Sequence, residues 1–226
     1  APPRLEVERT DYGFRYAGVY PRVEADGSES DYVRIYQFVM PFQQFRAQQA
    51  AARGRGGDVI PQVRGHLWVP IDDETTWIYN WMYASDPDQP FTPEFVRQSE
   101  IGSGRGTDDE VGTQRKRTRA NDWLIDRQMQ KTENYTGIFG INSQDLAVQE
   151  SMGPIVDRSR EHLGTTDQAI MTMRQLFLAA IKDLQEGIDP PGVNPDSHRG
   201  VRAADVVLEK GARWQDAAQN LLAARR

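Results

Sequence analysis

The sequence predicts an α+β fold in which a twisted antiparallel sheet precedes the helices, and three observations lead to it. Five segments within the first 84 residues are rich in Val, Ile, Tyr, Phe and Trp, the residue types enriched in β-strands. No helical periodicity separates these segments, so we expect neighbouring strands to pair antiparallel. The last third of the chain places apolar residues at three- and four-residue steps, which is typical of amphipathic helices.

The five predicted strands are bounded by turn-forming residues. They span residues 5–10, 12–20, 31–40, 65–71 and 75–84. Residues 26–28, Asp-Gly-Ser, predict a hairpin turn between the second and third strands, and the acidic residues 72–74 predict the turn between the last two. Because side chains alternate along a strand, Tyr32, Arg34 and Tyr36 are expected to lie on one face of the sheet.

Two polar stretches interrupt this plan and are predicted to be surface loops. Residues 43–58 begin with some helical character and end in glycine, and we interpret them as a candidate lid over a pocket. Residues 97–120 carry many charges together with Gly102, Gly104 and Gly106. These glycines do not complete a nucleotide-binding fingerprint, and no apolar strand precedes them.

A first helix is predicted at residues 143–151, after a strand-like apolar segment at 137–141. Ser143 is a suitable N-cap, because its hydroxyl can accept a hydrogen bond from a backbone N–H of the first turn. Asp145 then falls in the first turn, where an aspartate taken alone is usually a cap or a partner of the helix dipole. Gly153-Pro154 is expected to end this helix.

A long helix is predicted at about residues 166–186. Thr165 and Gln168 have the spacing of a capping box, and Gly187 followed by two prolines ends the helix. We expect its apolar stripe to pack against the sheet; the stripe consists of Ile170, Met173, Phe177, Ile181 and Leu184. A final short helix is predicted at about residues 214–224.

The composition limits the classes of protein to which the chain can belong. With 226 residues and 38% hydrophobic content the chain is expected to form a single domain over residues 1–226, of which 188–226 are a C-terminal extension. The net charge of −6 argues against a nucleic-acid partner. The longest apolar run, residues 176–181, is far shorter than a membrane span, and no leader sequence opens the chain, so a cytoplasmic location is expected.

The chain contains few candidates for catalytic or metal-binding side chains. His66, His162 and His198 do not have the spacing that lets two histidines of one helix bind the same metal. We interpret His66 as a strand residue, and His162 as a packed, hydrogen-bonded histidine or an interface residue. The chain has no cysteine, which excludes disulfides, thiolate catalysis and iron–sulfur ligation within it.

One segment carries a specific signature. Residues 134–167 contain Gln144-Asp145, Glu150-Ser151, Gly153-Pro154-Ile155, Asp157-Arg158, Glu161-His162-Leu163-Gly164 and Asp167. This pattern resembles the C-terminal catalytic domain of Rieske non-haem iron aromatic-ring oxygenases, of the phthalate 4,5-dioxygenase type. The resemblance is dense from residue 121 to 187 and weak in the two loops and after Gly192. Glu150, Asp157, Arg158 and Glu161 are interpreted as a polar network that fixes the helix and the turn after it.

The resemblance implies a helix-grip fold with a largely apolar pocket between sheet and helices, suited to a flat aromatic substrate. It also implies that Asp145 is the carboxylate ligand of a mononuclear Fe(II). In that family two histidine ligands come from a D-x-x-H-x-x-x-x-H motif, which does not occur in this chain. The histidine pair and the domain holding the [2Fe-2S] Rieske cluster are therefore expected upstream of this chain.

The activity that the resemblance implies is hydroxylation or O-demethylation of an aromatic substrate with dioxygen. Electrons are expected from NADH through a separate flavin and iron–sulfur reductase and the Rieske cluster. The expected assembly is a homotrimer or stacked trimers. Because such enzymes often act on aromatic carboxylates, Arg34 is a candidate substrate-binding residue: a guanidinium among tyrosines is costly unless paired. An alternative is that Arg34 forms a salt bridge with one of the chain's own acids.

Two other classes of function remain open from the sequence. Helix-grip folds also serve as non-catalytic carriers of apolar or aromatic ligands, and the chain is equally compatible with a structural assembly module. A histidine pair upstream, or iron in the complete protein, would distinguish the oxygenase from both.

Overall fold

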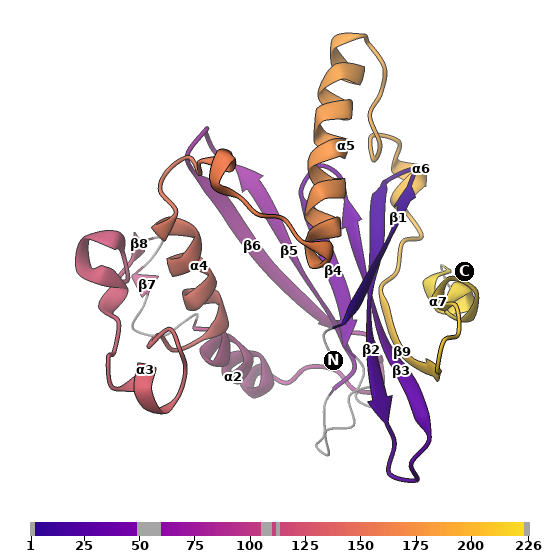
Figure 1. Ribbon diagram of the computed structural model, residues 1–226, viewed down its shortest axis with the longest axis horizontal. Coiled ribbons are helices and arrows are strands. Elements are labelled where there is room, and N and C mark those ends of the chain that lie inside the picture. The colour runs from indigo at the N-terminus through magenta and orange to yellow at the C-terminus, as the bar shows by residue number, and fades with distance from the viewer. Residues whose placement is uncertain (1–2, 49–59, 105–109, 112–113, 224–226) are drawn as a thin grey trace. The chain divides into compact units, whose positions relative to one another are not determined.

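The computed structural model describes residues 3–48, 60–104, 110–111 and 114–223 (Figure 1). It contains two compact units. The first, which we call the sheet unit, comprises residues 1–71, 76–90 and 162–226. The second, the helical unit, comprises residues 72–75 and 91–161. The part of the predicted lid at residues 49–58 lies outside the described residues.

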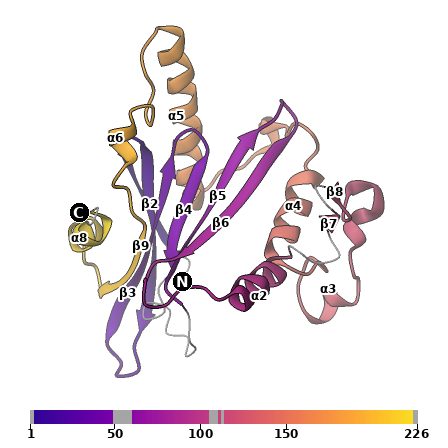
Figure 2. The same cartoon turned by 180° about the vertical axis from the view of Figure 1, so that it is seen from behind.

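The sheet unit contains a seven-stranded antiparallel sheet, which confirms the predicted α+β class. Its strands run in the order β1-β2-β3-β4-β5-β6, and a further strand, β9, pairs with β3. Their bounds are β1 Arg4–Thr10, β2 Gly13–Val23, β3 Glu29–Val39, β4 Gln43–Gln48, β5 Gln62–Pro70, β6 Thr76–Ala84 and β9 Ala204–Glu209. Figure 2, seen from behind, shows β9 running beside β3.

Strand β3 has two different partners along one edge. Its residues 30–35 pair with β9, and its residues 36–39 pair with β4. Neither β4 nor β9 was predicted. The predicted loop at residues 43–48 is wrong, because Phe45 and Ala47 alternate with outward-facing neighbours and are buried in the sheet.

The two faces of the sheet are covered by different helices. On one face, which we call the α5 face, Phe14 and Phe38 pack under helix α5 (Gln168–Gln185). On the other face, Ala17, Val33 and Ile35 pack with the C-terminal helices α7 (Trp214–Ala217) and α8 (Gln219–Leu222). The predicted single helix at 214–224 is thus two short helices. Along the chain, one further short helix, α6 (Pro195–His198), follows α5 and precedes β9.

Helix α5 is present, but two details of its prediction are wrong. Its N-cap is Asp167, within a 3₁₀ turn at Thr165–Asp167, so Thr165 and Gln168 do not form the capping box. Its buried residues are Leu176 and Ala180, joined by Met173 and Phe177. The other three members of the predicted stripe, Ile170, Ile181 and Leu184, are exposed.

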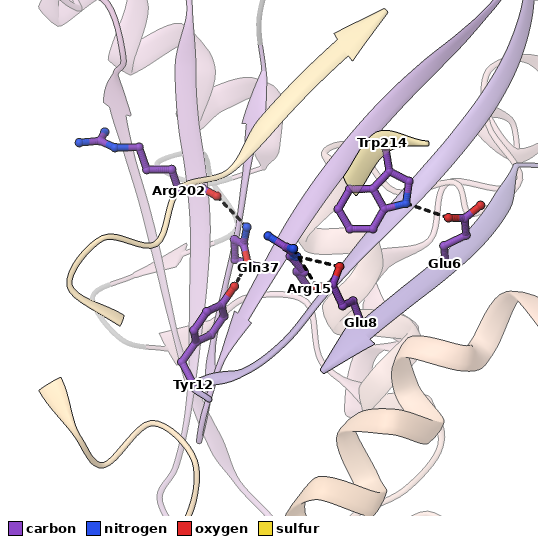
Figure 3. Close-up of polar contacts among 7 residues, drawn as sticks. All are labelled: Glu6, Glu8, Tyr12, Arg15, Gln37, Arg202 and Trp214. Carbon is purple, nitrogen blue, oxygen red and sulfur yellow. Dashed lines mark hydrogen bonds and ion pairs between the residues drawn. The ribbon is translucent and has the colours of Figure 1, made fainter. Parts of the chain in front are cut away.

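Polar contacts fasten the C-terminal segment to the sheet (Figure 3). Tyr12 Oη donates a 2.6 Å hydrogen bond to Gln37 Oε1, and Gln37 Nε2 donates one of 2.6 Å to the carbonyl oxygen of Arg202. Because Gln37 is only 1% exposed, both ends of its amide need such partners.

Trp214, which is only 1% exposed, makes a second set of contacts between the C-terminal segment and the sheet. Its Nε1 donates to Glu6 Oε2 at 2.8 Å, and the Arg15 guanidinium lies 5.5 Å from its ring centroid (Figure 3). Arg15 is itself held by Glu8 through two hydrogen bonds of 2.8 and 3.1 Å. These contacts tie α7 to β1 and β2.

The helical unit contains α2 (Pro93–Ser103), the short strands β7 (Glu110–Val111) and β8 (Gln114–Arg115), α3 (Met129–Thr132) and α4 (Ile141–Ser151). The predicted loop at 97–120 is therefore wrong for residues 97–103. Thr92 caps α2 by accepting a 3.1 Å hydrogen bond from the Phe95 N–H, and Pro93 occupies its first turn.

The predicted strand at 137–141 is also wrong. There the Asn134 side chain accepts hydrogen bonds from the backbone N–H groups of Thr136 and Gly137 and forms a turn. Among the described residues no helix is both long enough and apolar enough to cross a membrane.

Candidate functional site

Helix α4 carries the predicted iron ligand, and it begins earlier than predicted. Its N-cap is Gly140, whose φ of 83° favours glycine, and not Ser143. It ends at Met152 before Gly153, as predicted. Asp145 is therefore the fifth residue of the helix, and the first turn contains no acidic residue. The interpretation of Asp145 as a cap or dipole partner is wrong.

Asp145 is exposed, on a side of α4 that carries three exposed apolar residues together with the polar Asn142 and Gln149. Ile141, Val148 and Met152 are four residues before, three after and seven after it, which places them on the same side of the helix. They are 66%, 57% and 54% exposed.

The opposite side of α4 is packed within the helical unit. Ala147 is buried there. Near the start of α4, a Cβ added at Gly104 would clash with Ser143 Oγ, and one added at Gly140 would clash with the backbone of Gly104. The two glycines thus permit the close approach of α2 and α4.

Glu150 fixes the other end of α4. Its Oε2 accepts a 2.7 Å hydrogen bond from Trp123 Nε1 and lies 3.3 Å from Arg115 Nη2. The four residues of the predicted polar network have different partners. Asp157 caps the next turn by accepting from the Ser159 N–H, and Arg158 pairs with Glu161.

Trp123 lies in an unusual backbone segment. Asp122, Trp123 and Leu124 have φ values of 51°, 50° and 50°, the left-handed region that costs non-glycine residues roughly 1–2 kcal/mol each. Arg117 Nη1 stabilises the segment by donating to the carbonyl oxygens of Trp123 and Leu124 at 3.0 and 2.8 Å. Sequence reasoning missed Trp123, Arg115 and Arg117, because nothing in their spacing indicates this turn.

Arg34 lies partly buried on the α5 face of β3, between two phenols. Its Nη1 donates to Tyr36 Oη at 3.2 Å, its Nε lies 3.4 Å from Tyr32 Oη, and the guanidinium is 5.7 Å from the Tyr32 ring centroid. Burial acts to lower the pKa of Arg34, but the hydrogen bonds to Tyr36 and Tyr32 outweigh it and raise the pKa above its usual value. Arg34 is therefore a permanent cation.

The partners of Arg34 are held by further contacts. Tyr32 Oη donates to Asp205 Oδ2 at 2.7 Å, and the Tyr36 ring stacks on Tyr16 with centroids 4.6 Å apart. Gln44 Nε2 in turn donates to Tyr16 Oη at 2.6 Å, and burial raises the pKa of Tyr16, which stays a neutral phenol. The predicted strand pattern found Tyr32 and Tyr36. It missed Tyr16, Gln44 and Asp205, whose positions depend on strand register.

The alternative that Arg34 forms a salt bridge is not supported by its contacts. Within the part of the chain that the structure describes, its hydrogen bonds go to phenol oxygens, and no carboxylate forms an ion pair with it. Asp205 is reached through Tyr32.

The described residues do not by themselves form an iron site. Among them, no three His, Cys, Asp or Glu side chains lie together in a group that could hold a metal ion. His66 lies in β5 beside the Trp68 ring, and His198 lies in α6. His162 is exposed, so the first of its two interpretations, a packed histidine, is wrong, and the second, an interface residue, stays a prediction. Asp145 offers one oxygen donor of the three that a facial two-histidine-one-carboxylate site requires.

A cavity of about 790 Å³ lies in the sheet unit, at the turn after α5. Asp11, Asp183 and Asp189 line it together with residues 190–195. It is acidic, so it is not the apolar pocket expected for an aromatic substrate.

The sequence matches the family described as LigXa C-terminal domain like over residues 1–224. It is 33% identical over 219 residues to the phthalate 4,5-dioxygenase oxygenase subunit of Pseudomonas putida, which covers 95% of this chain and 46% of that protein. It is 30% identical over 227 residues to the 3-chlorobenzoate-3,4-dioxygenase oxygenase subunit of Comamonas testosteroni, with coverages of 95% and 50%.

A third relative is more distant. The 5,5'-dehydrodivanillate O-demethylase oxygenase subunit of a Sphingobium species is 26% identical over 132 residues, 57% of this chain and 24% of that protein. The chain spans about half the length of the two relatives that it matches along most of its own length. A family match over residues 1–224 and this level of identity mean that the chain belongs to the LigXa C-terminal-domain-like family, which confirms its resemblance to the C-terminal domain of the phthalate 4,5-dioxygenase type.

Proposed function

We propose that this chain is the catalytic-domain part of an oxygenase that uses mononuclear Fe(II) and dioxygen to hydroxylate or O-demethylate an aromatic compound, with Asp145 as the carboxylate ligand. One observation carries the proposal. Asp145 belongs to the family signature, yet it has neither the position of a helix cap nor a place on the packed side of α4. Three relatives named as aromatic dioxygenase or O-demethylase subunits support the reaction class.

An iron site at Asp145 needs two further protein donors, and no metal-binding group is found among the described residues. We propose two histidine ligands and a [2Fe-2S] Rieske cluster in the remaining half of the complete protein, and NADH as electron source through a separate reductase. We also propose a cytoplasmic homo-oligomer, a trimer or stacked trimers. When bound, the iron would activate dioxygen. The residues of this chain would hold the iron, bind the aromatic substrate and keep water away from it.

Arg34 is proposed to bind a carboxylate group of the substrate. Its guanidinium can form two parallel hydrogen bonds with a carboxylate, a geometry that lysine does not offer. Its present partners are neutral phenols, so its charge is not compensated by a direct ion pair among the described residues. The names of two relatives, phthalate and 3-chlorobenzoate dioxygenase subunits, refer to aromatic carboxylates.

Replacement of Asp145 tests the iron assignment in the complete protein. Asp145→Ala should abolish turnover and lower mononuclear iron content, while the visible absorption of the Rieske cluster is retained. Asp157→Ala is a matched control, because Asp157 belongs to the same signature but caps a local turn. It should retain iron.

Full iron occupancy in Asp145→Ala would contradict the assignment. A complete wild-type protein that binds the aromatic compound but holds no mononuclear iron would favour the alternative function, a non-catalytic domain that binds an aromatic or apolar ligand.

A further inference from the structure

Helix α4 is anchored on the side opposite Asp145. Glu150 follows Asp145 by five residues, which at 100° per residue places the two carboxylates about 140° apart around the helix axis. Ser143 and Ala147 lie on the same side as Glu150 by the same count. The rotation of α4 about its axis therefore decides where the Asp145 carboxylate points.

Contacts near both ends of α4 constrain this rotation. Within α4, all of whose residues are described, Ala147 alone is buried, and no side chain caps the N-terminus. The close approach of Gly104 to Ser143 holds the start of the helix. Glu150, near the other end, is held by the Trp123 indole and the Arg115 guanidinium.

The Trp123 indole is aimed at Glu150 by its left-handed backbone. Three consecutive non-glycine residues with positive φ are unfavourable, and they persist only where surrounding contacts hold them. Here Arg117 donates to two carbonyl oxygens of the segment, and the Trp123 N–H donates to the Thr118 carbonyl oxygen at 2.9 Å. From this strained turn, the Trp123 indole thus donates one hydrogen bond to Glu150 of α4.

We propose that Trp123 is a positioning residue for the Asp145 carboxylate and acts through Glu150. The strained turn 122–124 holds the indole N–H at a fixed place, and Glu150, bonded to it, fixes the rotation of α4. Loss of this bond would let α4 rotate and would misplace Asp145 while the protein stays folded. The inference rests on the proposed role of Asp145 as a metal ligand.

Two variants of the complete protein test this. Trp123→Phe keeps an aromatic ring and removes the N–H donor. Glu150→Gln is a milder change, because its amide oxygen can still accept from Trp123 while the charge facing Arg115 is lost. Two controls match them: Asp122→Asn removes the exposed ion pair of the same turn with Arg127, and Trp77→Phe makes the same substitution in β6.

Three measurements distinguish a misplaced Asp145 carboxylate from a less stable protein. The dissociation constant of mononuclear Fe(II) is measured by chelator competition, and the visible absorption of Co(II) in its place reports the ligand geometry. The melting temperature reports the fold. Loss of outer contacts that orient metal ligands typically weakens metal binding about 10- to 100-fold. We expect Trp123→Phe to raise the Fe(II) dissociation constant by about tenfold, at the low end of that range.

The expected pattern is a changed Co(II) spectrum for Trp123→Phe, a smaller change for Glu150→Gln, and wild-type spectra for both controls. A Trp123→Phe protein that melts earlier but keeps the wild-type dissociation constant and spectrum would overturn the inference. If Trp123→Phe fails to fold, Glu150→Ala provides the same test, because it removes the acceptor of the indole N–H. Unaltered iron binding and spectrum in Glu150→Ala would overturn the inference equally. If Asp145→Ala itself retained iron, the proposed function would have failed instead, whatever the Trp123 variants do.

Discussion

The Arg34 guanidinium lies between Tyr32 and Tyr36, and neutral phenols leave its charge able to attract a carboxylate. A charge-assisted hydrogen bond of this kind contributes about 1.5–3 kcal/mol. We therefore predict that Arg34→Ala raises the KM for an aromatic carboxylate about tenfold or more, since 1.4 kcal/mol corresponds to a factor of ten. The KM for a neutral aromatic analogue should hardly change. Steady-state kinetics on the two substrates provide the measurement.

Tyrosine variants refine this experiment. Tyr36→Phe removes the phenol that accepts the 3.2 Å hydrogen bond from Arg34, so it should raise the KM for the carboxylate by a smaller factor. Tyr20→Phe is the control, because Tyr20 contacts the Tyr32 ring without a hydrogen bond to Arg34. Equal losses on charged and neutral substrates in Arg34→Ala would mean that Arg34 is structural.

Glu6 is expected to make stability depend on pH. Burial acts to raise its pKa, but hydrogen bonds from Arg4 and Trp214 outweigh this and lower the pKa below its usual value. A group whose pKa is depressed by folding stabilises the protein above the unfolded-state pKa, and this contribution is lost as the pH falls through the folded-state pKa.

We predict that Glu6→Gln lowers the free energy of unfolding at pH 7 by about 0.2–1 kcal/mol, the range of a solvent-exposed ion pair, because Gln can still accept from Trp214 but loses the charge that faces Arg4. The difference from wild type should shrink as the pH falls from above the unfolded-state pKa through the lower folded-state pKa. Urea unfolding curves across this range provide the measurement. A difference that stays constant with pH would show that the charge of Glu6 contributes nothing and that only packing at Trp214 was disturbed.

At the scale of elements, the approach of α2 to α4 depends on Gly104 and Gly140. Gly104 ends α2 with φ 90°, and a Cβ there would clash with Ser143 Oγ. Alanine at a position with positive φ destabilises by more than about 1 kcal/mol. Gly104→Ala should therefore lower the free energy of unfolding by at least this amount, as thermal or urea denaturation would measure.

Gly102, in the same helix, provides a matched control. A Cβ there would meet nothing within 4 Å, so Gly102→Ala should stabilise α2 by about 0.5–1 kcal/mol. A Gly104→Ala protein as stable as wild type would mean that α2 and α4 do not pack as closely as the glycines suggest.

Some elements could be read from the sequence and others could not, for physical reasons. The strands rich in aromatic and β-branched residues were predicted because composition and alternation agree. Residues 43–48 contain three glutamines and an arginine, and they form β4 only because β3 and β5 pair with both of its edges. Such tertiary pairing overrides weak local preference.

Helix α5 illustrates a different limit. Its period was predicted correctly, but its buried side only in part: Met173 and Phe177 pack on the sheet, whereas Ile170, Ile181 and Leu184 are exposed. Ala180 is buried instead, in the same cluster as Phe38 and Met40 of the sheet. Which side of a helix is buried depends on the size of the side chains opposite, and these lie far away in the sequence.

At the scale of the whole molecule, some residues of the candidate site can be predicted from a sequence signature, whereas others are recognised only from the packing of the structure. Asp145 was found through the motif, and Arg34 through strand alternation. Trp123 could not be found, because its link to Glu150 spans 27 positions and depends on a left-handed turn without glycine. The histidine partners proposed for Asp145 are a third case, since the three histidines of this chain form no metal-binding group with it among the described residues.

This division leads to a prediction for the chain of 226 residues on its own. One carboxylate cannot hold Fe(II) against competition, because a facial site draws on three protein donors and metal affinity depends on all of them. The isolated chain should therefore contain far less than one iron per molecule after dialysis against a chelator, as metal analysis would measure. Asp145→Ala in the isolated chain should not change that content. Stoichiometric, chelator-resistant iron in the isolated chain would mean that His66, His162 or His198 is a ligand after all, and it would replace the proposed two-part site by one formed within this chain.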